Sequence, residues 1–187
     1  MARVAFMTFG VLHAPRTHRR SKGFLDGIPA IHEAAERSEG FVAGANLDSD
    51  IGRDRWGQLI CPGFLHEELG PHMARTLTLW ESLESLFAFA YAGPHAAALG
   101  GRKEWFRKTE FPGYVVWWVA DDQVPTFAEA TARLERLHER GPTPEAFTFS
   151  CPFDWDGTPT AIDHTLVNEI IARNAGRTHT DEPSVHA

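Results

Sequence analysis

The chain has 187 residues, of which 43% are hydrophobic and 23% charged, a balance typical of one globular domain with an apolar core. Its formal net charge is −7, and no run of Lys and Arg exceeds two residues, which argues against nucleic acid or an anionic membrane as the main partner. Cys61 and Cys151 form neither a CxxC pair nor a zinc spacing. Because no apolar run has signal-peptide or transmembrane length, we expect a cytoplasmic protein with reduced thiols.

The first half of the chain alternates predicted strands and helices. Residues 3–10 are rich in strand-forming side chains and end in glycine, which predicts a first strand. Apolar residues recur at helical spacing over 23–38, and a second strand is predicted over 40–47. Residues 48–71 form a long irregular insertion, of the kind that either covers a functional site or only decorates the surface. Residues 73–80 predict a third strand with one apolar and one polar face.

The next segments carry clear start and stop signals. Ser82 is the expected N-cap of a helix that Gly93-Pro94 interrupts, and a short helix is predicted over 95–106. The uninterrupted apolar segment 114–119 predicts a central strand that is covered on both faces. Residues 126–140 combine a capping box, an apolar stripe and a glycine stop, which together predict a helix.

The C-terminal part is predicted to be an extension. A short strand is expected over 146–149, a last helix over 163–175, and a disordered polar tail from Arg177. The chain is therefore interpreted as one domain over residues 1–150, followed by an extension over 151–187 that contains one helix and the tail.

The order of these elements indicates the fold class. It is β-α-β, insertion, β-α-β, then further α and β segments, which is the split β-α-β arrangement of a ferredoxin-like α+β fold with an antiparallel sheet. Helices would cover one face of this sheet. Leaving the aromatic strand 114–119 in water on the other face would forgo several kcal/mol, at ~25 cal/mol per Å2 of apolar surface. A second copy packed sheet against sheet would cover that face, so we predict a homodimer.

Several segments resemble a known family: AFMTFGVLHAP near the start, then TLWESLESLFAFAYAGPHAAAL, EWF, YVVWWV and GPTPEAFTF. In this order they resemble the DUF3291 family over about residues 3–150. The resemblance implies a dimeric α+β barrel, the superfamily that also contains antibiotic-biosynthesis monooxygenases. It implies less about activity, because one fold supports many functions.

The superfamily offers two chemical themes. One is cofactor-independent oxidation or rearrangement of aromatic compounds of secondary metabolism, and the other is heme chemistry. In the small heme-degrading branch the axial histidine falls at about Leu99 of this chain, and leucine cannot bind iron. We therefore expect a monooxygenase-like or isomerase/cyclase-like enzyme that needs no cofactor and acts on an apolar or aromatic small molecule. The alternatives are a heme enzyme with His95, His66 or His72 as ligand, and a non-catalytic dimeric carrier or sensor of an apolar ligand.

Three residues are predicted to be catalytic. His95 matches a position that the monooxygenase-like branch shares, and at a helix start the helix dipole disfavours its charged form. A neutral His95 would act as general base or orient a substrate hydroxyl, and the alternative is a histidine that only caps the helix break or lies in the core. His13 and Arg16, in the proline-containing loop after the first strand, would contact the substrate at the barrel mouth, and a solvated basic loop is the alternative.

Further side chains are candidates for substrate binding. Arg75 on the third strand requires a carboxylate or a ligand anion in a covered sheet, and a structural ion pair is the alternative. Tyr114 and Trp117, or else Trp118, are predicted to form apolar walls of the barrel interior, with plain core positions as the alternative. Trp80 and Trp105 are two further candidates for substrate binding.

The sequence predicts no metal site. The segment HEELGPH, residues 66–72, holds two histidines and two glutamates, but their spacing matches no zinc pattern. There is also no GxSxG, GxxxxGK[ST] or GxGxxG motif, which argues against serine hydrolase, P-loop and Rossmann chemistry. The expected partners are a small-molecule substrate and a second copy of the chain.

Overall fold

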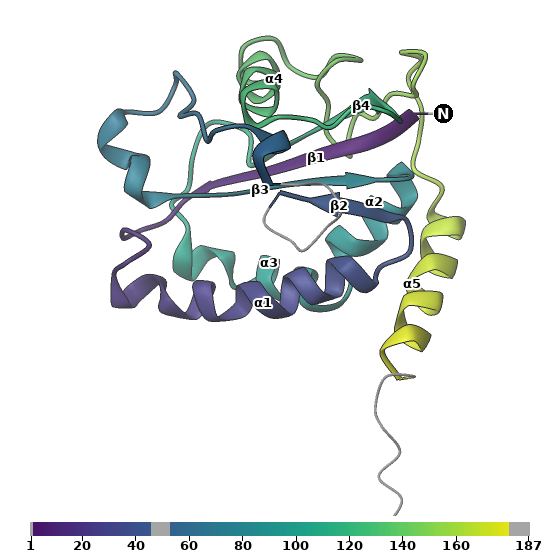
Figure 1. The fold of residues 1–187 in the computed structure, drawn as a ribbon, viewed down its shortest axis with the longest axis horizontal. Coiled ribbons are helices and arrows are strands. Elements are labelled where there is room, and N and C mark those ends of the chain that lie inside the picture. The colour runs from purple at the N-terminus through teal and green to yellow at the C-terminus, as the bar shows by residue number, and fades with distance from the viewer. Residues whose placement is uncertain (1, 46–52, 180–187) are drawn as a thin grey trace, which may run out of the picture.

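A computed structural model describes residues 2–45 and 53–179. Four strands form one antiparallel sheet in the order β2-β3-β1-β4, in agreement with the predicted ferredoxin-like α+β arrangement (Figure 1). The α-helices and strands, and the short 3-10 helices η1 to η3, are in chain order β1 (Ala2–Val11), η1 (Arg19–Ser21), α1 (Lys22–Arg37), β2 (Phe41–Gly44), η2 (Arg53–Trp56), η3 (Glu67–His72), β3 (Met73–Trp80), α2 (Leu83–Tyr91), α3 (Gly93–Trp105), β4 (Tyr114–Ala120), α4 (Phe127–Arg140) and α5 (His164–His179).

Two of the predicted helix starts are confirmed by their caps. The side chain of Ser82 accepts a hydrogen bond from the backbone N–H of Ser85 at 3.1 Å, at the start of α2. Thr126 caps α4 in the same way, by accepting from the N–H of Glu129 at 3.2 Å. Gly93 has a φ of +57°, a value that glycine tolerates best, and this lets the chain turn directly from α2 into α3. The break before His95 therefore sets the direction of α3.

One face of the sheet is covered by α1, α2 and α3, and the other by α4 (Figure 1). On the first face, Phe6 and Trp80 are buried against α2. Helix α5 adds Val167 and Ile170 to the same cluster. The extension predicted over 151–187 therefore shares the core of the preceding domain.

Helix α4 and the insertion cover the second face of the sheet. Met7, Leu77 and Trp117 are at most 1% exposed there. They pack in one cluster with Leu134 of α4 and Trp56 of η2. This differs from the expectation that a second copy must cover this face, because the chain covers it itself. The burial of the sheet therefore gives no argument for a homodimer.

The predicted short strand over 146–149 is not formed as such. Phe147 makes an isolated bridge with Val116 on the edge strand β4, with both backbone N–H to carbonyl distances at 2.9 Å. The chain then turns back on itself, because Thr148 and Cys151 form the next bridge. Only one residue pair is therefore aligned with β4.

The last helix continues further than expected. Helix α5 continues to His179, so Arg177 is helical rather than part of a disordered tail. Its guanidinium donates to the carbonyl of Arg37 at 3.4 Å, which ties this last turn to the end of α1. Residues 180–187, and residues 46–52 at the start of the predicted insertion, lie outside the described residues.

Candidate functional site

Two threonine hydroxyls lie at the centre of the sheet, on the face that α1, α2 and α3 cover. Thr8 of β1 and Thr76 of β3 are paired in the antiparallel register, and their Oγ1 atoms are 2.7 Å apart. Both residues are only half-buried, whereas Met7 and Leu77 beside them on the opposite face are at most 1% exposed. The helix-side face of the central strands is therefore not sealed at this point.

Two aromatic contacts connect α3 to the sheet on either side of the threonine pair, and the first runs through Phe89 of α2. At its start, the His95 ring lies 4.9 Å from the ring of Phe89, and Phe89 stacks on Trp80 at 4.9 Å. Just after its end, Phe106 packs on Gly10 so closely that an added Cβ would come within 2.6 Å of the ring. In the β1–β3 register, the threonine pair lies between Gly10 and Trp80. We use the name α3 layer for the residues that make these contacts, together with the threonine pair between them: Thr8, Gly10, Thr76, Phe89, His95 and Phe106.

His95 is held in one tautomer. Its Nδ1 lies 2.8 Å from the carbonyl oxygen of Ala90, and because a carbonyl only accepts, Nδ1 carries the proton. Burial lowers the pKa of His95, against the raising effect of this hydrogen bond, and favours a neutral ring at pH 7. The capping alternative is thus observed at the end of α2. The same hydrogen bond leaves Nε2 with its lone pair, which suits a base or an acceptor.

His13 and Arg16 lie at the other end of α3. The backbone N–H of His13 donates to the carbonyl of Trp105 at 2.8 Å, so His13 and Trp105 are neighbours. Arg16 is exposed, and its N–H donates to the carbonyl of Pro71 at 3.1 Å. His95 and Trp105 are ten residues apart in α3, which is about 15 Å along the helix axis. His13 and Arg16 therefore do not meet His95 around one reacting atom.

Trp80 and Tyr114 occupy core positions on the helix-side face. Trp80 is fully buried, and its indole N–H donates to the hydroxyl of Thr78 at 2.9 Å. The hydroxyl oxygen of Tyr114 accepts from the backbone N–H of Phe149 at 3.2 Å. Burial, reinforced by the neighbouring Tyr91, raises the pKa of Tyr114 to about 12. Tyr114 therefore stays protonated at neutral pH.

Tyr114 and Trp117 do not form one wall. They are three residues apart on β4, so they point to opposite faces of the sheet and belong to different core clusters. Trp118, the predicted alternative to Trp117, shares the helix-side face with Tyr114. Its indole N–H donates to the carbonyl of Phe153 at 2.7 Å. The aromatic residues of β4 are thus divided between the two cores.

Arg75 and Trp117 point toward α4, away from the α3 layer. The guanidinium of Arg75 donates to the backbone carbonyl of Ile60 in the insertion. Burial lowers the pKa of the Arg75 guanidinium. The indole N–H of Trp117 donates to Oε1 of Glu129 at 3.1 Å. Both side chains therefore tie the second face of the sheet to the elements that cover it.

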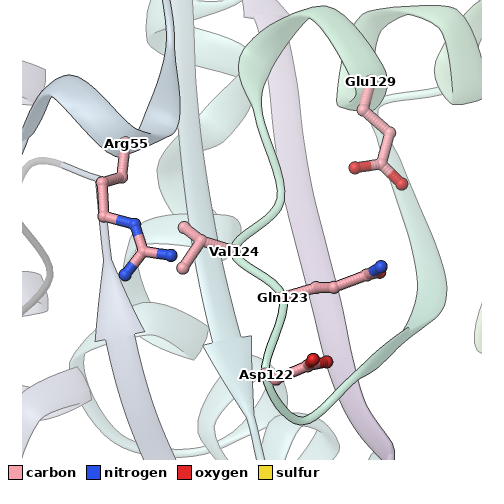
Figure 2. A pocket seen from close by; sticks show the side chains of 5 residues that line it. All are labelled: Arg55, Asp122, Gln123, Val124 and Glu129. Atoms are coloured by element: carbon pink, nitrogen blue, oxygen red, sulfur yellow. The ribbon is translucent and has the colours of Figure 1, made fainter.

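An open hollow of about 460 Å3 lies beside the start of α4. Oε1 of Glu129, at its edge, is already occupied, because it accepts from Trp117 Nε1 at 3.1 Å and from Arg133 Nε at 2.9 Å. The lining contains no histidine or cysteine and none of the predicted site residues, so the hollow does not match the predicted acid–base chemistry. The lining residues are Arg55, Asp122, Gln123, Val124 and Glu129 (Figure 2).

The threonine pair is absent from the residues that the sequence singles out. The alternation in β3 assigns Thr76 to the polar face, but its pairing with Thr8 depends on the strand register, which one sequence does not specify. The one signal in the sequence that could have indicated the pair is a threonine on the helix-side face of each of the two central strands. The α3 layer therefore contains one predicted residue, His95, and a pair of residues identified only from the structure.

One histidine of the segment 66–72 contacts a backbone carbonyl instead of a metal-binding group. Within residues 2–45 and 53–179, no group of three or more His, Cys, Asp or Glu side chains is arranged to hold a metal ion. The Nδ1 of His72 lies 3.1 Å from the carbonyl oxygen of Leu12, and so connects η3 to the end of β1. In the same described ranges, no helix is both long enough and apolar enough to cross a membrane.

The family model named Domain of unknown function (DUF3291) matches residues 3–163. The chain therefore belongs to this family, as the sequence segments quoted above predicted. The match continues past residue 150 to the residue before α5. No curated protein matches the chain.

Proposed function

We propose that this DUF3291 protein is a small-molecule enzyme in which Nε2 of His95 takes a proton from a substrate bound at the α3 layer. The observation that carries the proposal is the fixed tautomer of His95, whose Nδ1 lies 2.8 Å from the Ala90 carbonyl. A neutral imidazole with an anchored Nδ1–H presents its other nitrogen as a base. Burial, which lowers the pKa of His95, keeps that nitrogen unprotonated at neutral pH.

The composition of the α3 layer supports an apolar or aromatic substrate with an oxygen function. Phe89 and Phe106 supply apolar surface at its two ends. The hydroxyls of Thr8 and Thr76 share one hydrogen bond, so one of their two protons is left for a ligand oxygen. Removal of a proton from a substrate hydroxyl gives an oxyanion. Cofactor-independent oxidation by dioxygen, cyclisation or rearrangement of an aromatic secondary metabolite would begin from that oxyanion.

The test is turnover with His95 removed. A panel of polycyclic phenols would be offered to the purified protein, and dioxygen uptake and substrate absorbance would be followed. His95→Gln removes the base, so kcat should fall about a hundredfold while the fold is kept. His32→Gln is a matched control, because burial also lowers the pKa of His32 but this residue lies outside the α3 layer. An unchanged rate in His95→Gln would refute the assignment.

Two other functions are outcomes of the same measurements. A Soret band in the visible spectrum of the purified protein would replace the proposal with a heme enzyme that uses His95, His66 or His72 as its iron ligand. Saturable binding of an aromatic compound without any turnover would instead identify a carrier or sensor.

The homodimer also belongs to the proposal. The face of the sheet that a second copy was expected to cover is buried under α4 and the insertion. A dimer would therefore associate through another surface, and its subunits would each keep a complete α3 layer. Sedimentation equilibrium measures the mass directly, and a monomer at all concentrations would remove the dimer from the proposal.

A further inference from the structure

Two basic stretches contain much of the positive charge of this acidic chain. Residues 16–22 and 102–108 hold eight of the 18 Lys and Arg residues and a single carboxylate, Glu104. Their formal charge is +7 in a chain whose net charge is −7, so all other residues together carry −14. The charge is therefore distributed very unevenly along the sequence.

Backbone contacts bring the two stretches to the same end of the α3 layer. Leu12 and Phe106 form an isolated bridge, and the N–H of Arg107 donates to the carbonyl of Val11 at 2.8 Å. The ring of Phe24, near the start of α1, lies 5.0 Å from the ring of Phe106. The loop after β1, the start of α1 and the end of α3 therefore meet around Phe106, which itself belongs to the α3 layer. We call this region the basic end.

Most cations of the basic end are available to a ligand. Lys22 is paired with Asp26 at 2.5 Å, and Nε of Arg107 donates to the carbonyl of Leu12 at 3.3 Å. The others are exposed and form no ion pair with any residue that the structure describes: Arg16, Arg19, Arg20, Arg102, Lys103 and Lys108. An anion that approaches this end meets several unneutralised charges at once.

We propose that the basic end selects ligands with a negative charge, so that the substrate of the α3 layer is an apolar or aromatic anion such as a carboxylate. This inference rests on the proposed function for the location of the ligand. Clustered charge of one sign attracts an oppositely charged ligand and raises its association rate. The other residues of the chain carry a formal charge of −14, which repels the same anion from the rest of the surface. Encounters are thereby directed to the end of the α3 layer where Phe106 lies.

The experiment compares 2-naphthoate with its uncharged methyl ester. Quenching of tryptophan fluorescence gives the affinities, and stopped-flow mixing gives the association rates between about 0.02 and 0.3 M NaCl, a range over which the screening length changes severalfold. We expect 2-naphthoate to associate about tenfold faster than the ester at low salt, and this preference should shrink as salt is added. The ester should show no dependence on salt.

Two charge reversals make a matched pair. Arg102 lies in the last turn of α3 and Arg140 in the last turn of α4, and both are exposed. Arg102→Glu and Arg140→Glu therefore change the net charge and the helix end in the same way, but only Arg102 belongs to the basic end. Arg102→Glu should slow the association of 2-naphthoate severalfold at low salt and leave the ester unaffected. Arg140→Glu should leave both compounds unaffected.

The outcomes separate this inference from the proposed function. Equal binding of acid and ester, or an equal loss in Arg102→Glu and Arg140→Glu, would overturn the selection of anions. Turnover is not needed for this measurement, so an unchanged rate in His95→Gln would refute the catalytic proposal without altering the preference for the acid. If neither compound binds, the anion inference fails together with the ligand site on which it rests.

Discussion

Replacement of Gly10 by alanine tests whether Phe106 closes one end of the α3 layer. The added Cβ would stand 2.6 Å from Cδ1 and Cε1 of Phe106, whereas carbon atoms prefer a separation of about 3.5–4.0 Å. The ring has little room to withdraw, since it lies 5.0 Å from the ring of Phe24. Overpacking of this kind costs about 1–3 kcal/mol. We expect Gly10→Ala to lower the free energy of unfolding by that amount.

A double-mutant cycle assigns this loss to the contact itself. Urea denaturation followed by tryptophan fluorescence would be compared for Gly10→Ala, Phe106→Ala and the double variant. Once the ring is absent, alanine at position 10 should be neutral or stabilise by up to about 1 kcal/mol, because it restricts the unfolded chain. Gly100→Ala is the control, since no atom lies within 4 Å of its added Cβ. It should stabilise α3 by roughly 0.5–1 kcal/mol. A stabilised Gly10→Ala protein, or an equal loss with and without the ring, would refute the close packing.

Three further changes test other parts of the structure. Burial lowers the pKa of His95 in the folded state. The free energy of unfolding should therefore fall as the pH drops below about 6.5. Urea titrations at several pH values measure this decline, which should be weaker in His95→Gln. Trp117→Phe removes the indole N–H that donates to Glu129 and should lower the free energy of unfolding by about 1–2 kcal/mol, whereas an unchanged urea midpoint would mean that this bond does not stabilise the fold. Thr126→Ala removes the cap of α4 and should cost about 1 kcal/mol, seen as a lower thermal midpoint, and an unaltered midpoint would contradict the cap.

The strands and helices follow from local patterns, but the layers do not. β3 begins at Met73 and ends at Trp80 as the alternation in the sequence predicts, and α4 ends before Gly141 as its stop signal predicts. The apolar stripe of α4 is equally compatible with either face of the sheet. That α4 and Trp56 cover the second face depends on the path of the chain after β4 and before β3, and periodicity in the sequence does not specify these paths. The argument for a dimer through that face was wrong for this reason.

The candidate site is predictable only in part. Sequence spacing correctly places His95 at the helix break, but the choice between cap and base depends on the distance from its Nδ1 to the Ala90 carbonyl. The structure shows the cap, through the contact of His95 Nδ1 with the Ala90 carbonyl, and the role of Nε2 as a base is part of our proposal. Tyr114 and Trp117 were assigned to one wall because an uninterrupted apolar strand does not reveal which side chains share a face. A strand pattern with two buried faces carries no alternation to separate them.

The length of α3 determines how the basic end and His95 can act together. His95 and Trp105 are ten residues apart, or about 15 Å along the helix, which exceeds the screening length of about 10 Å at 0.1 M salt. The charges beyond Trp105 should therefore affect the entry of a ligand rather than the protonation of His95. We expect Arg16→Glu to slow the association of an anionic substrate while the pH at which turnover rises stays the same. A stopped-flow association rate and a pH–rate profile on the same variant measure both. A displaced profile with an unchanged association rate would show that the basic end acts on His95 itself.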